Sequence, residues 1–172
     1  MMKKLAQRVG LIFVIVASAM IFAVPGAEAR GNSRQGSFQL GGGAGLALNP
    51  PVRFELEIGG EYFFWENVGV GMNIDFFFRG PTAFLFQPFA RYHFDIDSAP
   101  EWVPYVGGGI GVGVNTNGSG ALDLMLPDFG VQYELVENRL FLGTDMSVHL
   151  VTNFDDTDWD FRWLFITANY RF

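Results

Sequence analysis

Apolar and polar side chains alternate along most of this chain, most clearly at its C-terminal end. Ile166, Tyr170 and Phe172 fall on one parity there, whereas Thr167 and Arg171 fall on the other. Successive side chains of a strand point to opposite faces, so this pattern predicts an amphipathic strand. Eight such segments separated by turn residues are expected. They are Ser37–Leu48, Val52–Phe64, Val68–Phe78, Leu85–Phe94, Tyr105–Val114, Met125–Val136, Leu140–Val151 and Phe161–Phe172.

The charged residues of these segments share the face opposite the large apolar residues. In the second segment, for example, Glu55 and Glu57 alternate with Phe54 and Leu56. A slip of one residue would exchange the two faces, so the register is strongly specified. We expect lipid outside and a polar interior, because an arginine at the bilayer midplane costs about 2–4 kcal/mol. The interior network is predicted to contain Arg53, Glu55, Glu57, Glu61, Asp75, Arg91, Glu134, Asp145 and Arg171.

The same rule assigns the faces of the last segment. Counting back from Phe172 with strict alternation places Leu164 on the lipid face, and Trp163 and Phe165 inside. Arg162 is then expected at the outer membrane interface, where a long side chain can reach lipid headgroups.

The N-terminus has the pattern of an export signal. Lys3, Lys4 and Arg8 precede an apolar run from Val9 to Val24, and a small-x-small site ends at Ala29. The run is shorter than the ~20 residues needed to span a bilayer. Residues 1–29 are therefore predicted to be a cleaved secretory signal peptide. Residues 30–172 are predicted to form one domain.

The length of that domain suits eight strands of ~9–11 residues and not the sixteen of a general porin. The predicted fold is all-β, an eight-stranded antiparallel up-and-down transmembrane barrel. Short turns after even strands place the N-terminus in the periplasm, and outward aromatic residues form a girdle at each membrane interface.

Composition narrows the classes of partner and chemistry. The whole chain has a formal net charge of −7, no cysteine, and no lysine after Lys4. An acidic chain without a basic face is a poor nucleic-acid binder. The absence of cysteine excludes disulfides and Cys-based metal sites or nucleophiles. No cofactor is expected.

Two sequence features carry a resemblance to a known family. The chain ends in Tyr170-Arg171-Phe172, and a glycine-rich stretch runs from Pro104 to Gly113. In these it resembles the small eight-stranded outer-membrane barrels, the OmpA-barrel, OmpX and OmpW-like group. The resemblance implies a monomer in a Gram-negative outer membrane, in contact with outer-membrane lipid and lipopolysaccharide. It also implies that Tyr170 and Phe172 are an assembly signal for the barrel-assembly machinery. The family includes anchors, channels, adhesins and lipid-modifying enzymes, so fold does not decide function.

Two further constellations are candidates for chemistry. Asp145, Ser147 and His149 share one inward face, but alternate residues of a strand lie ~6.5–7 Å apart, which disfavours a direct Ser–His bond. Lipid A deacylase barrels place such a pair in the order His-x-Ser and on the lipid-facing side, unlike this chain.

An acidic outer loop is a candidate divalent-cation rim, through which lipopolysaccharide phosphates could be bridged, although it lacks the glycine and glutamate of an EF-hand. Its members are Asp155, Asp156, Asp158 and Asp160. His93 and His149 are expected toward opposite ends of the barrel, which argues against a shared metal site.

Whether the lumen is closed or open distinguishes the candidate functions. An eight-stranded barrel is just wide enough to be filled by side chains, which favours a salt-bridged plug over a charged pore. Two inward glycine rows, Gly41 to Gly45 and Gly107 to Gly113, leave room for large side chains or a narrow cavity. The expected function is a structural or interaction role with a closed or very narrow lumen, and no enzymatic activity. The alternatives are a channel for small solutes or slender ligands and a lipid-active hydrolase.

Overall fold

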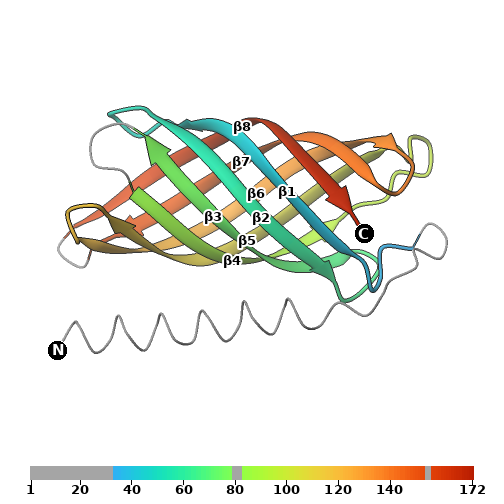
Figure 1. The fold of residues 1–172 in the computed structure, drawn as a ribbon, viewed down its shortest axis with the longest axis horizontal. Helices are drawn as coiled ribbons and strands as arrows, with labels where there is room; N and C mark the ends of the chain where they lie inside the picture. Colours follow the sequence, from blue (N-terminus) through green and yellow to red (C-terminus); the bar gives the residue numbers. More distant parts are fainter. Residues whose placement is uncertain (1–32, 79–82, 154–155) are drawn as a thin grey trace.

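All strands in the described part of the chain belong to one antiparallel sheet that closes on itself. The computed structural model describes residues 33–78, 83–153 and 156–172. Consecutive strands are neighbours and β1 pairs with β8, so the sheet is a closed barrel (Figure 1). The strands are β1 (Phe38–Ala47), β2 (Arg53–Phe63), β3 (Val68–Phe78), β4 (Ala83–His93), β5 (Trp102–Asn115), β6 (Gly120–Val136), β7 (Leu140–Thr152) and β8 (Thr157–Arg171).

This architecture confirms the predicted eight-stranded up-and-down barrel. Closure leaves no strand edge unpaired, which a sheet surrounded by lipid requires. In the residues with a described structure, no helix is long and apolar enough to cross a membrane. The predicted signal peptide, residues 1–29, lies outside the described residues.

The two ends of the barrel differ in the connections they carry. The Phe172 amide donates to the Phe38 carbonyl at 2.8 Å, so the barrel begins and ends at the same end, here called the terminal end. The other end, here called the far end, carries the β1–β2, β3–β4, β5–β6 and β7–β8 connections (Figure 1). β6 and β8 reach further toward the far end than predicted, beginning at Gly120 and Thr157. The β5–β6 connection is therefore only residues 116–119.

A β-bulge in β8 changes which of its side chains face the lumen. The register shifts between the pairs Gly143–Thr167 and Asp145–Leu164, and it shifts again on the β1 side of the same strand. The extra residue makes both Phe165 and Ile166 face outward, 46% and 49% exposed. Leu164 is buried inside, because a bulge inverts the alternation of all residues that precede it.

This bulge overturns the predicted faces of four residues, which were assigned by strict alternation. Leu164 and Arg162 were expected outside, but they are 3% and 4% exposed and lie in the lumen. Trp163 and Phe165 were expected inside, but they are 39% and 46% exposed and lie on the outer face. A second shift, between Met125 and Asp128 of β6, turns Asp123 inward in the same way.

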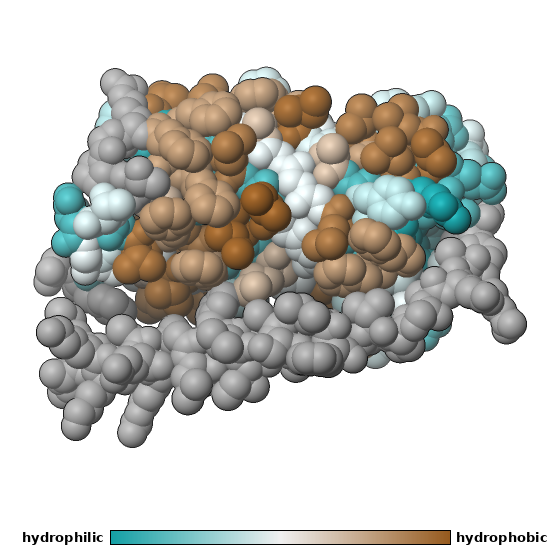
Figure 2. Space-filling view, viewed as in Figure 1, coloured by the Kyte–Doolittle hydropathy of each residue, from teal (hydrophilic) through white to brown (hydrophobic). Residues whose placement is uncertain are grey.

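The outer wall is apolar and carries aromatic pairs at both ends. Hydrophobic side chains cover most of the face visible in Figure 2. Near the terminal end, four edge-on ring pairs have centroids 4.9–5.0 Å apart. They are Tyr62–Phe64, Tyr92–Phe94, Trp102–Tyr133 and Tyr170–Phe172. Toward the far end, Phe54 contacts Phe78, and Phe76 contacts Phe84. These pairs occupy the two positions expected for interfacial girdles.

Candidate functional site: the polar lumen

The inner faces of the strands hold most of the polar residues that the sequence placed there. Six of the expected network residues are less than one-tenth exposed, namely Glu55, Glu61, Asp75, Arg91, Asp145 and Arg171. Arg53 and Glu57 are partly buried, and Glu57 accepts a hydrogen bond from the Asn73 amide at 2.8 Å. Glu134 lies near the terminal end, where it lines the same cavity as Arg171 and accepts a hydrogen bond from the backbone N–H of Asn138.

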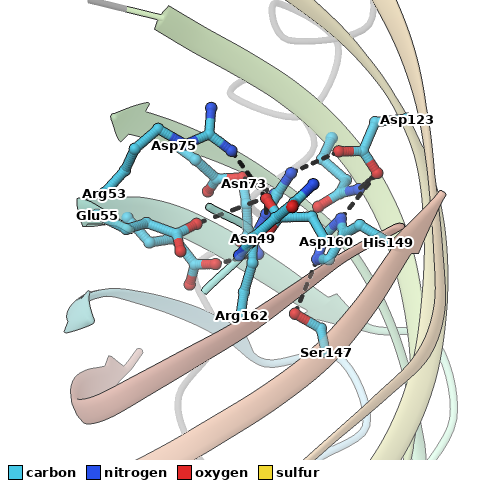
Figure 3. A network of polar contacts seen from close by, with 12 residues as sticks. Asn49, Arg53, Glu55, Asn73, Asp75, Asp123, Ser147, His149, Asp160 and Arg162 are labelled. Carbon is cyan, nitrogen blue, oxygen red and sulfur yellow. Dashed lines mark hydrogen bonds and ion pairs between the residues drawn. The ribbon is translucent and has the colours of Figure 1, made fainter. Parts of the chain in front are cut away.

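Arg162 is the centre of the far-end half of the network (Figure 3). Its guanidinium donates to Asp123 at 2.6 Å and lies 3.5 Å from both Asp75 and Asp160. Asp160 is shared, because Arg53 also donates to it at 2.9 Å. The Phe77 ring lies against both guanidiniums, with centroid distances of 4.9 Å for Arg53 and 4.7 Å for Arg162. This group, here called the far tier, joins β8 to β3 and β6 across the lumen.

Arg91 is the centre of a second group, here called the central tier. Its guanidinium donates to Asp128 at 2.6 Å and to Asp145 at 3.1 Å. The Tyr105 hydroxyl donates to the same Asp145 carboxylate at 2.5 Å. The guanidinium also lies over the rings of Phe89 and Tyr105, at 4.3 and 4.7 Å. This tier joins β4 to β6 and β7 across the lumen, at a different depth from the far tier.

The interior between these tiers is filled on the side of the β5 glycines. A Cβ on Gly109 would lie 2.6 Å from the Pro88 carbonyl oxygen and 3.2 Å from the Met125 Cε. On Gly111, a Cβ would lie 2.8 Å from the Leu85 Cδ1. The glycine row therefore makes room for side chains and backbone of the neighbouring strands.

Ser147, His149 and Asp123 form a connected hydrogen-bond chain beside the far tier (Figure 3). Ser147 Oγ lies 2.8 Å from His149 Nε2, and His149 Nδ1 lies 2.7 Å from Asp123 Oδ1. The spacing of alternate strand residues was expected to disfavour a direct bond between Ser147 and His149. That expectation is wrong, because the imidazole bends along the strand and reaches the hydroxyl. The acid that orients the histidine is Asp123 of β6, whereas Asp145 belongs to the central tier. His93 bonds Glu61 at 2.8 Å, away from His149.

One member of the predicted acidic rim, Asp160, does not lie in it. Asp160 belongs to β8 and is 2% exposed, with Arg53 and Arg162 as its partners. It points inward because the β8 bulge inverts the parity of the strand. Asp156 and Asp158 are exposed, and Asp155 lies outside the described residues. Among the residues whose structure is described, no group of three or more His, Asp or Glu side chains is arranged to hold a metal ion.

Three residues of the far tier were missed by the sequence analysis: Asp123, Asp160 and Arg162. Strict alternation assigned Arg162 to the outer face, and it left the two aspartates in predicted loops. One available signal was the run of four apolar residues from Trp163 to Ile166, which interrupts an otherwise regular alternation and is compatible with a bulge.

Comparison with known proteins places the chain by its fold. No family model matches the sequence, and no curated protein is significantly similar to it. Several solved structures are similar. The outer membrane protein OprG from Pseudomonas aeruginosa has a TM-score of 0.59 at 12% identity, over 82% of this chain and 98% of that one. Neisserial surface protein A has a TM-score of 0.57 at 16% identity, over 78% and 94%.

A third is the N-terminal β-barrel domain of Pseudomonas aeruginosa OprF, with a TM-score of 0.55 at 16% identity, over 80% and 98% of the two chains. A designed transmembrane β-barrel has a TM-score of 0.52 at 14% identity. The expected resemblance to small eight-stranded outer-membrane barrels is confirmed at the level of the fold.

Proposed function

We propose that this protein is a monomeric barrel of a Gram-negative outer membrane, with a structural or interaction role and a closed lumen. The observation that carries the proposal is the pair of tiers, in which Arg91 and Arg162 each bind carboxylates from strands across the barrel. Ion pairs that cross the lumen in this way support a closed lumen, because they place side chains in the path of a solute.

The outer surface supports a membrane location. Large hydrophobic side chains remain exposed on all eight strands or their ends, including Leu40, Ile58, Ile110 and Leu126. Contiguous exposed apolar surface of this kind is unfavourable in water and favourable in lipid. The similar solved barrels include proteins described as outer-membrane proteins.

Export by residues 1–29 and assembly through Tyr170 and Phe172 complete the proposal. Asp156 and Asp158, exposed at the far end, would share divalent cations with lipopolysaccharide phosphates.

Electrical recording from planar bilayers tests the closed lumen. The folded protein should give no steady single-channel current, because the two tiers block the lumen at two depths. Regular conductance steps that change when Arg91 or Arg162 is replaced would instead support the alternative, a channel for small solutes.

One observation favours a hydrolase as a second candidate: the Ser147–His149–Asp123 chain connects the same atoms as a Ser-His-Asp triad. Two observations oppose it. Ser147 is only 5% exposed, and the Asp123 carboxylate is also held by Arg162.

Labelling with a fluorophosphonate probe distinguishes a closed structural barrel from a hydrolase. On the closed-barrel proposal, folded protein forms no adduct. An adduct at Ser147 that disappears in His149→Gln would establish the nucleophile and support the hydrolase.

A further inference from the structure

A cavity of about 560 Å³ opens at the terminal end of the barrel. Its size falls within the ~300–1,000 Å³ of small-molecule sites. Strand residues Val103, Phe141 and Arg171 form its inner part, together with Arg34, which precedes β1. Residues of the β2–β3, β4–β5 and β6–β7 connections form its mouth. Nothing in the proposed structural role uses this cavity.

Arg171 differs from the two arginines of the tiers because, among the described residues, no carboxylate lies within ion-pair distance of it, although Glu134 and Glu61 act on it at longer range. It is 6% exposed, and its guanidinium lies between the rings of Phe63 and Phe141, 5.2 and 4.3 Å from their centroids. Nη2 donates to the Gln39 side-chain oxygen at 3.3 Å, and in the described part of the chain Nε has no hydrogen-bond partner and no carboxylate forms an ion pair with this arginine. A buried charge that lacks a counter-ion is unfavourable, so this position favours binding of an anion.

Arg34 supplies a second buried guanidinium to the same cavity. Its Nη2 donates to Asp95 at 2.5 Å, whereas its buried Nη1 has no partner among the described residues. Partial burial raises the pKa of Asp95, but hydrogen bonds from Arg34 and Asn67 outweigh this and hold the pKa below its usual value. Asp95 therefore stays ionised and fixes one edge of Arg34, which leaves the other edge available to a ligand.

The mouth of the cavity has the opposite charge. Among the described residues, no basic side chain of the connections lines it, whereas four acidic ones do besides Asp95, namely Glu66, Asp97, Glu101 and Glu137. These carboxylates would repel a simple anion on its way in, and they would attract a cationic group. A ligand that satisfies both parts of the cavity has an anionic end and a cationic end.

We propose that this cavity binds a small zwitterion. A carboxylate end lies against Arg171 and Arg34, because a planar carboxylate matches the fork of guanidinium N–H donors. An ammonium end points to the carboxylates of the mouth. The proposal does not depend on whether the central and far tiers close the lumen.

NMR of the arginine side-chain Nε–H groups tests the site in the folded, full-length mature chain in detergent micelles. The probes are unbranched ω-amino carboxylates of increasing length, with acetate and ethylammonium as the single-charge comparisons. We expect a saturable shift of the Arg171 Nε–H signal with the zwitterions. One chain length should bind at least about threefold more tightly than acetate, which corresponds to ~0.65 kcal/mol.

Because these variants lack the Arg171 Nε–H group, Arg171→Gln and Arg171→Lys are followed by the Arg34 Nε–H signal, which should no longer respond in Arg171→Gln and should respond more weakly in Arg171→Lys. Arg139→Gln is the matched control, since Arg139 is exposed in the β6–β7 connection and does not line the cavity. Heat-modifiable gel mobility shows whether each variant folds, and the wild-type titration stands without any variant. An equal response to acetate, chloride and zwitterions would mean an adventitious ion only, and no shift of Arg171 at all would equally overturn the proposal.

Discussion

Single arginines connect distant strands inside this barrel. Arg91 of β4 binds carboxylates of β6 and β7, and Arg162 of β8 binds carboxylates of β3 and β6. A guanidinium suits this position because it offers several N–H donors in a rigid plane and also stacks on aromatic rings such as Phe77. Each arginine therefore neutralises more than one carboxylate, and its loss affects several strands.

At this scale we predict that Arg91→Leu strongly destabilises the barrel. The change leaves Asp128 and Asp145 buried without their cation, and an uncompensated buried charge of this kind costs ~3–5 kcal/mol, less where water enters the lumen. Unfolding by urea in detergent, followed by heat-modifiable mobility, measures the difference.

Two variants control this experiment. Arg139→Leu removes an exposed arginine and should change the free energy of unfolding by less than ~0.5 kcal/mol. Asp145→Asn added to Arg91→Leu should recover part of the loss, because it removes one of the stranded charges. Equal effects of Arg91→Leu and Arg139→Leu would contradict the central tier.

At the scale of the element, bulges decide which face of a strand meets lipid. β8 carries one extra residue at Phe165–Ile166, so the strand has one alternation toward the terminal end and the inverse alternation toward the far end. Arg162 and Asp160 enter the lumen as a result. A single inserted residue thus brings Arg162 and Asp160 into the far tier.

Site-directed spin labelling of β8 tests this bulge. The chain has no cysteine, so single cysteines can be introduced directly. Labels at positions 165 and 166 should both be accessible to oxygen dissolved in the lipid, whereas labels at 164 and 167 should be shielded. Regular alternation through 163–168, as an unbroken strand would show, would rule the bulge out.

The glycines of β5 give a second prediction for an element. Gly109→Ala should destabilise the barrel by ~1–3 kcal/mol, because the new methyl group meets the Pro88 carbonyl oxygen at 2.6 Å. Gly113→Ala is the matched control on the same face, since its nearest neighbour would lie at 3.7 Å. Urea unfolding of the two variants should separate them, and an equally small effect of both would indicate an open lumen at Gly109.

For the whole molecule, closure depends on the seam between the first and last strands. β1 pairs with β8 along its length, and the Phe172 amide donates to the Phe38 carbonyl at the terminal end of this seam. The Phe172 ring is half exposed and packs edge-on against Tyr170, at 4.9 Å between centroids. The last residue is therefore both the end of the seam and a surface feature on the outer wall.

Deletion of Phe172 should slow membrane assembly in cells and leave protease-sensitive protein in the periplasm. Pulse–chase labelling with heat-modifiable mobility measures the rate, and Phe172→Tyr, which keeps an aromatic ring, should assemble almost normally. Refolding into lipid vesicles without other proteins distinguishes the two roles, because a lost seam contact slows it and a lost recognition signal does not. Assembly of the truncated chain at the normal rate would argue against the signal.

Much of the fold could be predicted because alternation repeats over many residues. A polar set such as Glu55, Glu57 and Glu61 opposite Phe54 and Leu56 has only one register that keeps charge out of lipid. Strand number, antiparallel order and the inward position of Arg91 and Asp145 follow from that local constraint together with chain length. The strand ends near the far end were less predictable, since bulges there interrupt the alternation.

The sequence by itself determined the barrel, because the two-residue period of a strand is local and lipid penalises every violation of it. Tertiary structure alone decided which charges meet. Asp123, His149 and Ser147 come from two strands, and Arg162 reaches Asp75 only because the barrel closes and the β8 bulge turns the side chain inward. Bulge positions depend on the pairing of both neighbouring strands at once, and contacts across a lumen depend on curvature, neither of which is encoded in any single stretch of the chain.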